Sequence, residues 1–358
     1  MSGINYKFYT KTDTAWEAML ADLERASVSI DLERFIFFPD TVGTRFIDLL
    51  IRKSRQGIKV RILLDMVGSY WFYRSTAILN DLAKAGVQVK FFNPISPWRI
   101  TNVTSYFFRD HRKFLIIDGK IGYIGGTGID EKTKDWRDTE VCFEGDLVAD
   151  FTLLFDRLWE STLKQKFMRF NMLPLKQSGF WVLTNSPRFG ERRIYRAYLK
   201  NIRQSRNYIY LTTPYFIPDL RFLTALRRAA RRGVDVRILV PRGSNHSFVD
   251  NSTRSYFTLA LRAGIRIYLY EPGMLHAKTA VIDDAWSAIG TFNLDNLSFH
   301  YNYEAVVIST EKDFIRTLKD HFINDREVAS EVYYEEWIRR PFLDKVREFI
   351  TWPFHDLF

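Results

Sequence analysis

Cysteine is nearly absent from this chain of 358 residues, which contains Cys142 and no other. A lone cysteine excludes a disulfide within the chain and a zinc site built from cysteine thiolates, and it suits a reducing compartment. Because Cys142 lies in an apolar stretch at 141–143, we expect an ordinary buried side chain rather than a reactive thiol.

Long hydrophobic runs are also missing. No stretch approaches the ~20 apolar residues that a membrane-spanning helix needs, and the opening residues MSGINYK lack the apolar core of a signal peptide. We therefore expect a protein of the cytosol, or one attached peripherally to the cytoplasmic side of the cell membrane.

Acidic side chains are outnumbered, 42 against 52 basic ones, which gives the chain a net charge of +10. A positive surface favours an anionic partner, either an acidic phospholipid membrane or a nucleic acid, and charge alone does not choose between them. Aromatic residues make up 16% of the chain, a high share that points to contact with something apolar.

The sequence contains an internal duplication. Three blocks recur in the same order and at a nearly constant spacing, which pairs Gly57 with Gly233 and Pro39 with Pro218. The paired blocks are SIDLERFIFFPD at 29–40 with YIYLTTPYFIPD at 208–219, RQGIKVRILLD at 55–65 with RRGVDVRILVP at 231–241, and KAGVQVKFFNP at 84–94 with RAGIRIYLYEP at 262–272. Chance does not keep three blocks in register, so the two halves should share one fold.

Each half alternates strand-like and helix-like segments. The first half predicts, in order, a strand at 28–38, a helix at 44–56, a strand at 60–64, a helix at 78–84 and a strand at 87–92. Such alternation predicts an α/β layer fold with parallel strand pairing. We expect a first lobe at 1–164, a second lobe at 165–330 and a tail at 331–358.

A histidine motif of the form H-x-K-x4-D follows the last matched block of each half. The six motif residues are candidates for catalysis: His111, Lys113, Asp118, His276, Lys278 and Asp283. Both segments are apolar and predict strands, on which positions i and i+2 share a face, so histidine and lysine would point at one bound group. A ring nitrogen and an ammonium suit a phosphate, because one attacks it and the other neutralises its charge. The aspartates precede a turn, a position that suits an orienting or structural role.

Small residues and then a carboxylate follow each motif. The small segments are GGTG at 125–128 and GTFN at 290–293, where the backbone can approach a phosphate and Asn293 can donate a hydrogen bond. Further along, Asp138 follows the first motif and Glu304 follows the second at a closely matched spacing. A histidine that attacks needs a carboxylate on its other nitrogen, to fix its tautomer and stabilise the imidazolium.

These motifs, with GMLHAKTAVIDDAWSAIGTFNLDNLSFHYNYE at 273–304 and TPYFIPD at 213–219, resemble the phospholipase D superfamily and, within it, bacterial cardiolipin synthases in a short form without N-terminal transmembrane helices. The resemblance implies two α/β/α lobes, related by a pseudo-twofold axis, with one shared active site. It also implies a two-step displacement without metal or cofactor. One histidine becomes phosphatidyl-histidine; the other protonates the leaving alcohol and then deprotonates the acceptor alcohol.

Residue by residue, the resemblance implies that His111 and His276 react, with His111 favoured as the nucleophile. It makes Asp138 and Glu304 the carboxylates that orient the rings. The residues it assigns to phosphate binding are Lys113, Lys278, Asn293, Thr291 and Thr127. The first half departs from the family pattern at Gly128, where the family usually has asparagine, so Thr127 or a backbone N–H would have to supply the missing donor.

Candidates for contact with substrate or membrane lie outside the motifs. An insert at 95–110, without counterpart in the second half, either reaches a bilayer or acyl groove or packs on the protein. The amphipathic tail from Arg339 either lies in a membrane interface or caps the second half. The candidate contacts are Trp98, Phe107 and Phe108 in the insert, Trp352 in the tail, and Trp71 and His246 after predicted strands.

The basic run at 227–232 ends a predicted helix, and cations favour helix C-termini. We therefore expect a solvated helix end there, rather than a binding patch.

Several functions stay open. The leading one is a phosphatidyltransferase that makes cardiolipin from phosphatidylglycerol, with an anionic phospholipid membrane as partner and no nucleic acid. Water as acceptor would instead give a hydrolase that releases phosphatidic acid. The further alternatives are a phosphodiesterase on nucleic acid, which the aromatic insert and apolar tail disfavour, and a membrane-binding module with an inactive site, which the two intact motifs disfavour.

Overall fold

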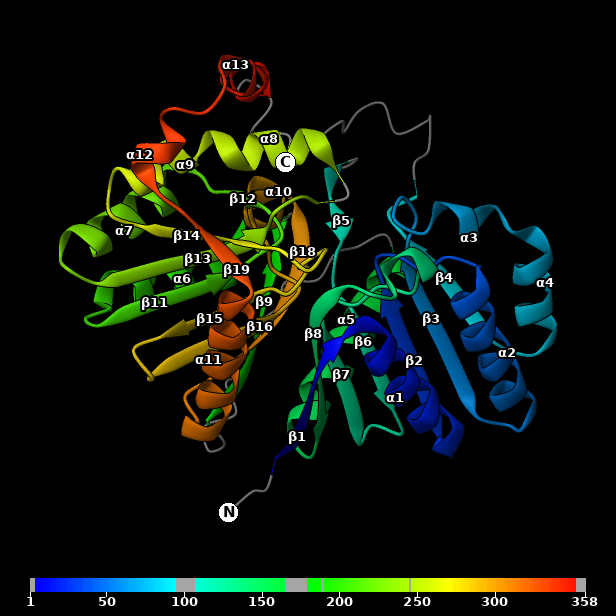
Figure 1. Cartoon of the computed structure of the whole chain (residues 1–358). Helices are drawn as coiled ribbons and strands as arrows, with labels where there is room; N and C mark the ends of the chain where they lie inside the picture. The colour runs from blue at the N-terminus through cyan, green and yellow to red at the C-terminus, as the bar shows by residue number, and fades with distance from the viewer. Residues whose placement is uncertain (1–3, 95–106, 165–178, 188–189, 245, 352–358) are drawn as a thin grey trace.

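The computed structural model describes residues 4–94, 107–164, 179–187, 190–244 and 246–351. They form two large β-sheets flanked by helices, one sheet for each half of the sequence, and the two lie side by side in Figure 1. Among the described residues, no helix is both long enough and apolar enough to cross a bilayer.

The first half contains, in chain order, β1 (Asn5–Lys11), α1 (Thr12–Arg25), β2 (Ser29–Arg34), α2 (Thr41–Arg55), β3 (Lys59–Asp65), α3 (Tyr70–Arg74), α4 (Thr76–Lys84), β4 (Gln88–Phe92), β5 (Arg109–Asp110), β6 (Phe114–Ile117), β7 (Ile121–Gly125), the 3-10 turn η2 (Glu131–Thr133), β8 (Arg137–Glu144) and α5 (Leu147–Lys164).

The second half contains β9 (Phe180–Ser186), β10 (Glu191–Arg192), α6 (Arg193–Gln204), β11 (Tyr208–Thr212), β12 (Phe216–Ile217), α7 (Leu220–Arg231), β13 (Asp235–Pro241), α8 (Ser247–Ser255), α9 (Phe257–Leu261), β14 (Arg266–Tyr270), β15 (Thr279–Ile282), β16 (Trp286–Gly290), β17 (Leu294–Asp295), α10 (Asn296–His300), β18 (Asn302–Ser309), α11 (Lys312–Glu327), β19 (Ala329–Val332), α12 (Tyr334–Trp337) and α13 (Phe342–Thr351).

The two sheets repeat one strand order, so the duplication in sequence is a duplication of structure. The first runs β1-β8-β7-β6-β2-β3-β4, and the second runs β9-β18-β16-β15-β11-β13-β14, with β10 and β19 added at its edges. The predicted parallel pairing holds for β2, β3 and β4 and for β11, β13 and β14. The other pairs along these two paths are antiparallel, since tight turns join β6 to β7 and β15 to β16.

Equivalent helices begin and end at equivalent residues. Asp40 and Asp219, each preceded by proline, cap α2 and α7, and their carboxylates accept hydrogen bonds from backbone N–H groups three residues on, at 3.0 and 2.7 Å. Gly57 and Gly233 lie just beyond the same two helices with φ angles of 90° and 88°, a conformation that glycine adopts at no steric cost.

An apolar cluster joins the lobes, in addition to one cluster within each lobe. Its centre is formed by α5 and α11 between the sheets, where Phe143, Phe180 and Phe314 pack against one another. Buried Cys142 belongs to the core of the first lobe. The shared core keeps the two lobes in one relative orientation, which a site assembled from both lobes requires. The expected boundary after residue 164 falls at the end of α5; the domain limits stay a prediction.

Candidate active site

The first three residues of each H-x-K motif lie just before a strand, which corrects the prediction that these segments are strands throughout. His111 to Lys113 link β5, which pairs with β18 of the second half, to β6 of the first sheet. The backbone N–H of His111 donates to the oxygen of Tyr303 at 3.0 Å, and that of His276 donates to the oxygen of Arg137 at 2.8 Å. The backbone of each half therefore positions the histidine of the other.

The two orienting carboxylates also pair crosswise. His111 Nδ1 lies 3.0 and 3.1 Å from the carboxylate oxygens of Glu304, and His276 Nδ1 lies 2.7 Å from Oδ2 of Asp138. Each histidine thus receives its carboxylate from the other half of the chain. A carboxylate that accepts the Nδ1 proton leaves Nε2 free to react.

Both carboxylates are held in the ionised form. Burial raises the pKa of Glu304 and of Asp138, but the histidine and lysine beside each carboxylate outweigh that effect. His111 and Lys113 bring the pKa of Glu304 below its ordinary value, and His276 and Lys278 do the same for Asp138.

The bases are held towards their neutral forms. Burial lowers the pKa of His111, and it lowers the pKa of His276 to about 4 with help from the charge of Lys278. Burial and mutual repulsion of the two ammonium groups lower the pKa of Lys113 to about 7, and burial lowers that of Lys278 to about 8. A bound anion would offset the repulsion between the two ammonium groups.

Glu304 has additional hydrogen-bond donors. Its carboxylate accepts from Ser298 Oγ at 2.7 Å and Asn302 Nδ2 at 3.3 Å, and also from the hydroxyl of Thr291. Thr291 therefore supports the carboxylate and lies outside the cavity lining, so its contact with phosphate stays a prediction. Asn293, two residues further on, does line the cavity.

The small segment of the first half makes room for its own carboxylate. A Cβ on Gly126 would lie 2.3 Å from Oδ1 of Asp138, so glycine is required where the second half has threonine. Thr127 is buried outside the cavity lining, and its N–H donates to Glu140 Oε2 at 3.3 Å. Gly128 lines the cavity, so the first half offers backbone where the second offers the amide of Asn293.

The two motif aspartates, candidates for catalysis, bind the backbone instead of the cavity, an arrangement that favours the structural alternative. Asp118 accepts hydrogen bonds from the backbone N–H groups that lead into β2, from Ser27 to Ser29, at 2.7 to 3.2 Å. Asp283 accepts from those that lead into β11, at 2.7 and 2.8 Å. Both lie outside the cavity lining and tie each motif strand to its neighbour.

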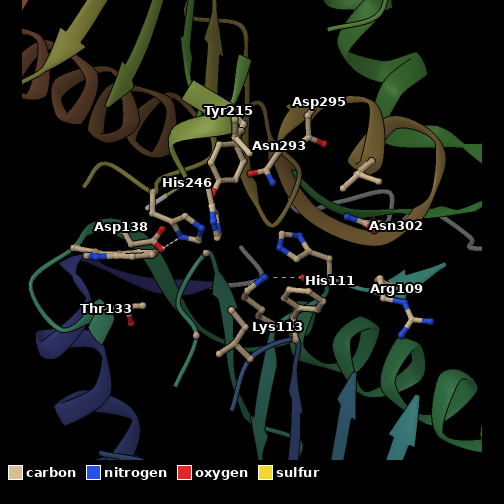
Figure 2. A pocket seen from close by; sticks show the side chains of 18 of the residues that line it. Arg109, His111, Lys113, Thr133, Asp138, Tyr215, His246, Asn293, Asp295 and Asn302 are labelled. Atoms are coloured by element: carbon tan, nitrogen blue, oxygen red, sulfur yellow. Dashed lines mark hydrogen bonds and ion pairs between the residues drawn. The ribbon is translucent and has the colours of Figure 1, made fainter. Parts of the chain in front are cut away.

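A cavity of about 430 Å³ is lined by both motif histidines (Figure 2). In Figure 2, His111 and Lys113 point into it from one side, and Tyr215, His246 and Asn293 from the opposite side. Most of its remaining wall is apolar and consists of Phe35, Ile36, Trp136, Phe248, Val249 and Leu297. The arrangement suits a ligand that has a phosphate at its centre and apolar parts beside it.

Sequence reasoning missed several residues of the cavity, among them Phe35 and Trp136, and it placed Arg109 only within the insert at 95–110. The Phe35 ring lies 5.0 Å from the His111 ring, and the Trp136 ring lies 5.1 Å from the His276 ring. Trp136 precedes Asp138 by two residues, and Asn302, its counterpart in the second half, precedes Glu304 by two residues. This spacing could have identified both as cavity residues. Phe35 and Arg109 have no such signal.

The candidate membrane contacts divide into several groups. Trp98 and Trp352 lie outside the described residues. Trp71 on α3 is 59% exposed and Phe107 is 50% exposed, while Phe108 is half-buried; none of these three lines the cavity. His246 does line the cavity, as its position after a strand suggested.

Replacing Lys113 with methionine should raise the melting temperature at pH 7 by a few degrees. The unfolded lysine has an ordinary pKa of 10.5 while the folded one is lowered to about 7, so the folded state holds the ammonium at a cost. The gain should shrink as the pH rises towards about 10, where the unfolded lysine also loses its proton.

Differential scanning calorimetry across this pH range measures the effect, with exposed Lys120→Met as the matched control. A melting temperature that falls or does not change in Lys113→Met would contradict the expected strain.

Comparison with known proteins gives one consistent result. The family model described as "Cardiolipin synthase, PLD-like domain" matches residues 19–159 and 198–326. The chain is 35% identical to the cardiolipin synthase of Geobacillus kaustophilus over 96% of its length and 70% of the relative's, and 35% identical to cardiolipin synthase 2 of Bacillus anthracis over 95% and 69%. The structure of phosphatidylserine synthase from Haemophilus influenzae is also similar, with a TM-score of 0.77 and 14% sequence identity. The match covers 99% of this chain and 95% of the synthase chain, which shows a common fold.

Proposed function

Because the chain belongs to the cardiolipin synthase family with its phospholipase D-like domains, we propose that it transfers a phosphatidyl group from one phospholipid to a hydroxyl of phosphatidylglycerol and so makes cardiolipin. The observation that carries the proposal is the crosswise arrangement of two histidine–carboxylate pairs around one cavity. Such symmetry suits a reaction that uses one histidine as nucleophile and the other as acid and base.

In the first step, Nε2 of His111 attacks the phosphorus of the donor lipid. The bond between phosphorus and the oxygen of the head alcohol breaks, and His276 supplies the proton that the leaving alcohol takes. In the second step, His276 takes the proton of the acceptor hydroxyl, whose oxygen attacks phosphorus and releases His111. With phosphatidylglycerol as donor and acceptor, the products are cardiolipin and glycerol.

Lys113 and Asn293, which line the cavity, would bind the phosphate oxygens throughout both steps, while Lys278, which lies outside the lining, would act through its charge. Burial and, after it, the charges of Lys113 and Lys278 lower the pKa of the histidines, and a bound phosphodiester anion would offset the charges. Substrate binding would thereby raise the pKa of His276 and let it carry the proton that the leaving alcohol needs.

We propose a peripheral position on an anionic membrane, at its cytoplasmic side, and the exposed apolar side chains support contact with a bilayer. Helix α13 packs against α8 with one face and leaves Phe342 and Phe349 each 77% exposed on the other, so the tail both covers the second lobe and offers an apolar surface. Figure 1 shows α13 and α3, which carries Trp71, at the upper ends of the two lobes, on either side of β5. Such residues can enter the interfacial layer of a bilayer.

Liposomes that contain labelled phosphatidylglycerol test the proposal, with lipid chromatography as the readout and no added metal. Wild type should produce cardiolipin and glycerol in equal amounts. His246→Ala serves as a comparison for a residue that lines the cavity outside the proposed chemistry.

Phosphatidic acid as sole product would mean that water is the acceptor and would overturn the transferase assignment. Unchanged lipid, with cleavage of single-stranded DNA or RNA, would favour a phosphodiesterase on nucleic acid.

A further inference from the structure

Helices α6 and α7 of the second lobe form a strongly basic groove outside the active site. Two adjoining hollows of about 560 and 260 Å³ lie along these helices. Their charged lining residues, all exposed, are Arg196, Lys200, Arg203, Arg221, Arg228 and Arg232. In the described part of the chain, no carboxylate lines either hollow and none of the six forms an ion pair. Figure 1 shows α7 at the outer edge of its lobe, away from the first sheet.

The first lobe provides an internal reference for this groove. Helix α1 is the counterpart of α6 in the register that pairs Pro39 with Pro218, and α2 is the counterpart of α7 in the register that pairs Gly57 with Gly233. In the second register, the buried and exposed positions of α2 from residue 44 onwards recur along α7. The two helix pairs can therefore be compared residue by residue.

The exposed edge of the helix pair is charge-balanced in the first lobe. Glu17 and Glu24 of α1 each form an ion pair with an arginine of α2, at 2.6 Å. Arg196 and Arg203 occupy the corresponding positions of α6. The second lobe therefore has positive charge where the first has the carboxylates that neutralise its helix pair.

The second helix of each pair carries arginines in both lobes. Arg45 and Arg52 of α2 correspond to Arg221 and Arg228 of α7, and all four are exposed. Lys200 occupies the position of an alanine. Five positions that carry two glutamates, two arginines and an alanine in the first lobe thus carry five cations in the second. Cations gathered without carboxylates repel one another and lower their energy by binding an external anion.

We propose that the groove between α6 and α7 binds the phosphate groups of anionic phospholipids, as a second lipid site apart from the histidines. Arg228 and Arg232, expected from sequence to form a solvated helix end, then belong to a binding surface. The choice of a lipid rests on the proposed function and on the lining. The uncharged lining residues include Leu199 and Leu220 and no aromatic side chain among the described residues, whereas single-stranded nucleic acids are usually held by aromatic stacking.

The test measures binding of the full chain, in a His276→Ala background that prevents turnover, to vesicles of phosphatidylcholine with or without phosphatidylglycerol. Arg196→Glu/Arg203→Glu introduces the residues that the first lobe has at these positions, and Arg196→Gln/Arg203→Gln removes the charge alone. Because each basic residue near an anionic surface contributes about 1 kcal/mol, the glutamine pair should weaken binding by roughly tenfold or more, and the glutamate pair further. Lys84→Glu/Lys120→Glu, exposed in the first lobe, makes the same change in net charge and should have a smaller effect.

The outcomes separate the sources of phosphate. A graded loss on the vesicles with phosphatidylglycerol, with little change on phosphatidylcholine alone, supports the site. If the control pair lost as much vesicle binding as the groove variants, the effect would come from net charge alone, and the proposed site would be overturned. Inorganic phosphate that displaces the protein from vesicles would assign the groove to free phosphate, and tighter binding of a single-stranded oligonucleotide at the same salt would assign it to nucleic acid. Because turnover of wild type is assayed separately, a failure of the proposed function and a failure of the groove give different results.

Discussion

His111→Ala should lower phosphatidyl transfer by about 10⁴-fold or more, and His276→Ala should cause a loss of similar size. Each variant removes one of two groups that act as a unit, so the single losses should not add in the double variant. The buried surroundings of both rings are formed by other residues, and the folded state should persist, as circular dichroism and the melting temperature would report.

The two variants should nevertheless differ with an activated donor. A phosphatidyl ester of p-nitrophenol needs no proton on its leaving group, so His276→Ala should release p-nitrophenol and accumulate a phosphatidyl-histidine that mass spectrometry can locate. His111→Ala should release none. The opposite pattern would make His276 the nucleophile and reverse the proposed roles.

Asp138→Asn should lower transfer by about 10³- to 10⁴-fold without unfolding the protein, because an amide that donates to Nδ1 holds the ring in the wrong tautomer. The crosswise pairing predicts which histidine is affected. Asp138 holds His276 at 2.7 Å, so Asp138→Asn should resemble His276→Ala and release p-nitrophenol from the activated donor. Glu304→Gln should resemble His111→Ala and release none.

The control for this comparison is Glu140→Gln, which changes a buried carboxyl two residues from Asp138 that does not contact either histidine. Glu140→Gln should change the melting temperature more than it changes the rate of p-nitrophenol release relative to the rate of transfer to the acceptor. If Asp138→Asn blocked release from the activated donor, the crosswise pairing would not describe the working site.

Several features could be predicted from sequence because they depend on local pattern or on the duplication itself. The Pro-Asp signals before α2 and α7 and the glycines after them mark helix ends that the backbone must satisfy locally. The repeated H-x-K-x4-D motif predicted two histidines and two lysines that the structure brings together, and its aspartate before a turn indicated a structural role. Local pattern was less reliable at strand ends. The sequence predicted that His111 and Lys113 lie on a strand, but both precede β6. The segment just before them, β5, pairs with β18 of the second half.

The sequence by itself determined that the protein is a duplicated α/β fold with two histidine–lysine motifs, two carboxylates and the chemistry of phosphate transfer. Only the tertiary structure decided which carboxylate serves which histidine. Spacing along the chain places Asp138 nearer to His111, yet the docking of the lobes places it against His276. That docking depends on a core in which α5 and α11 pack between two sheets, and such contacts join residues far apart in the chain. A carboxylate's partner across this interface follows from how two surfaces fit together, and no local pattern contains that information.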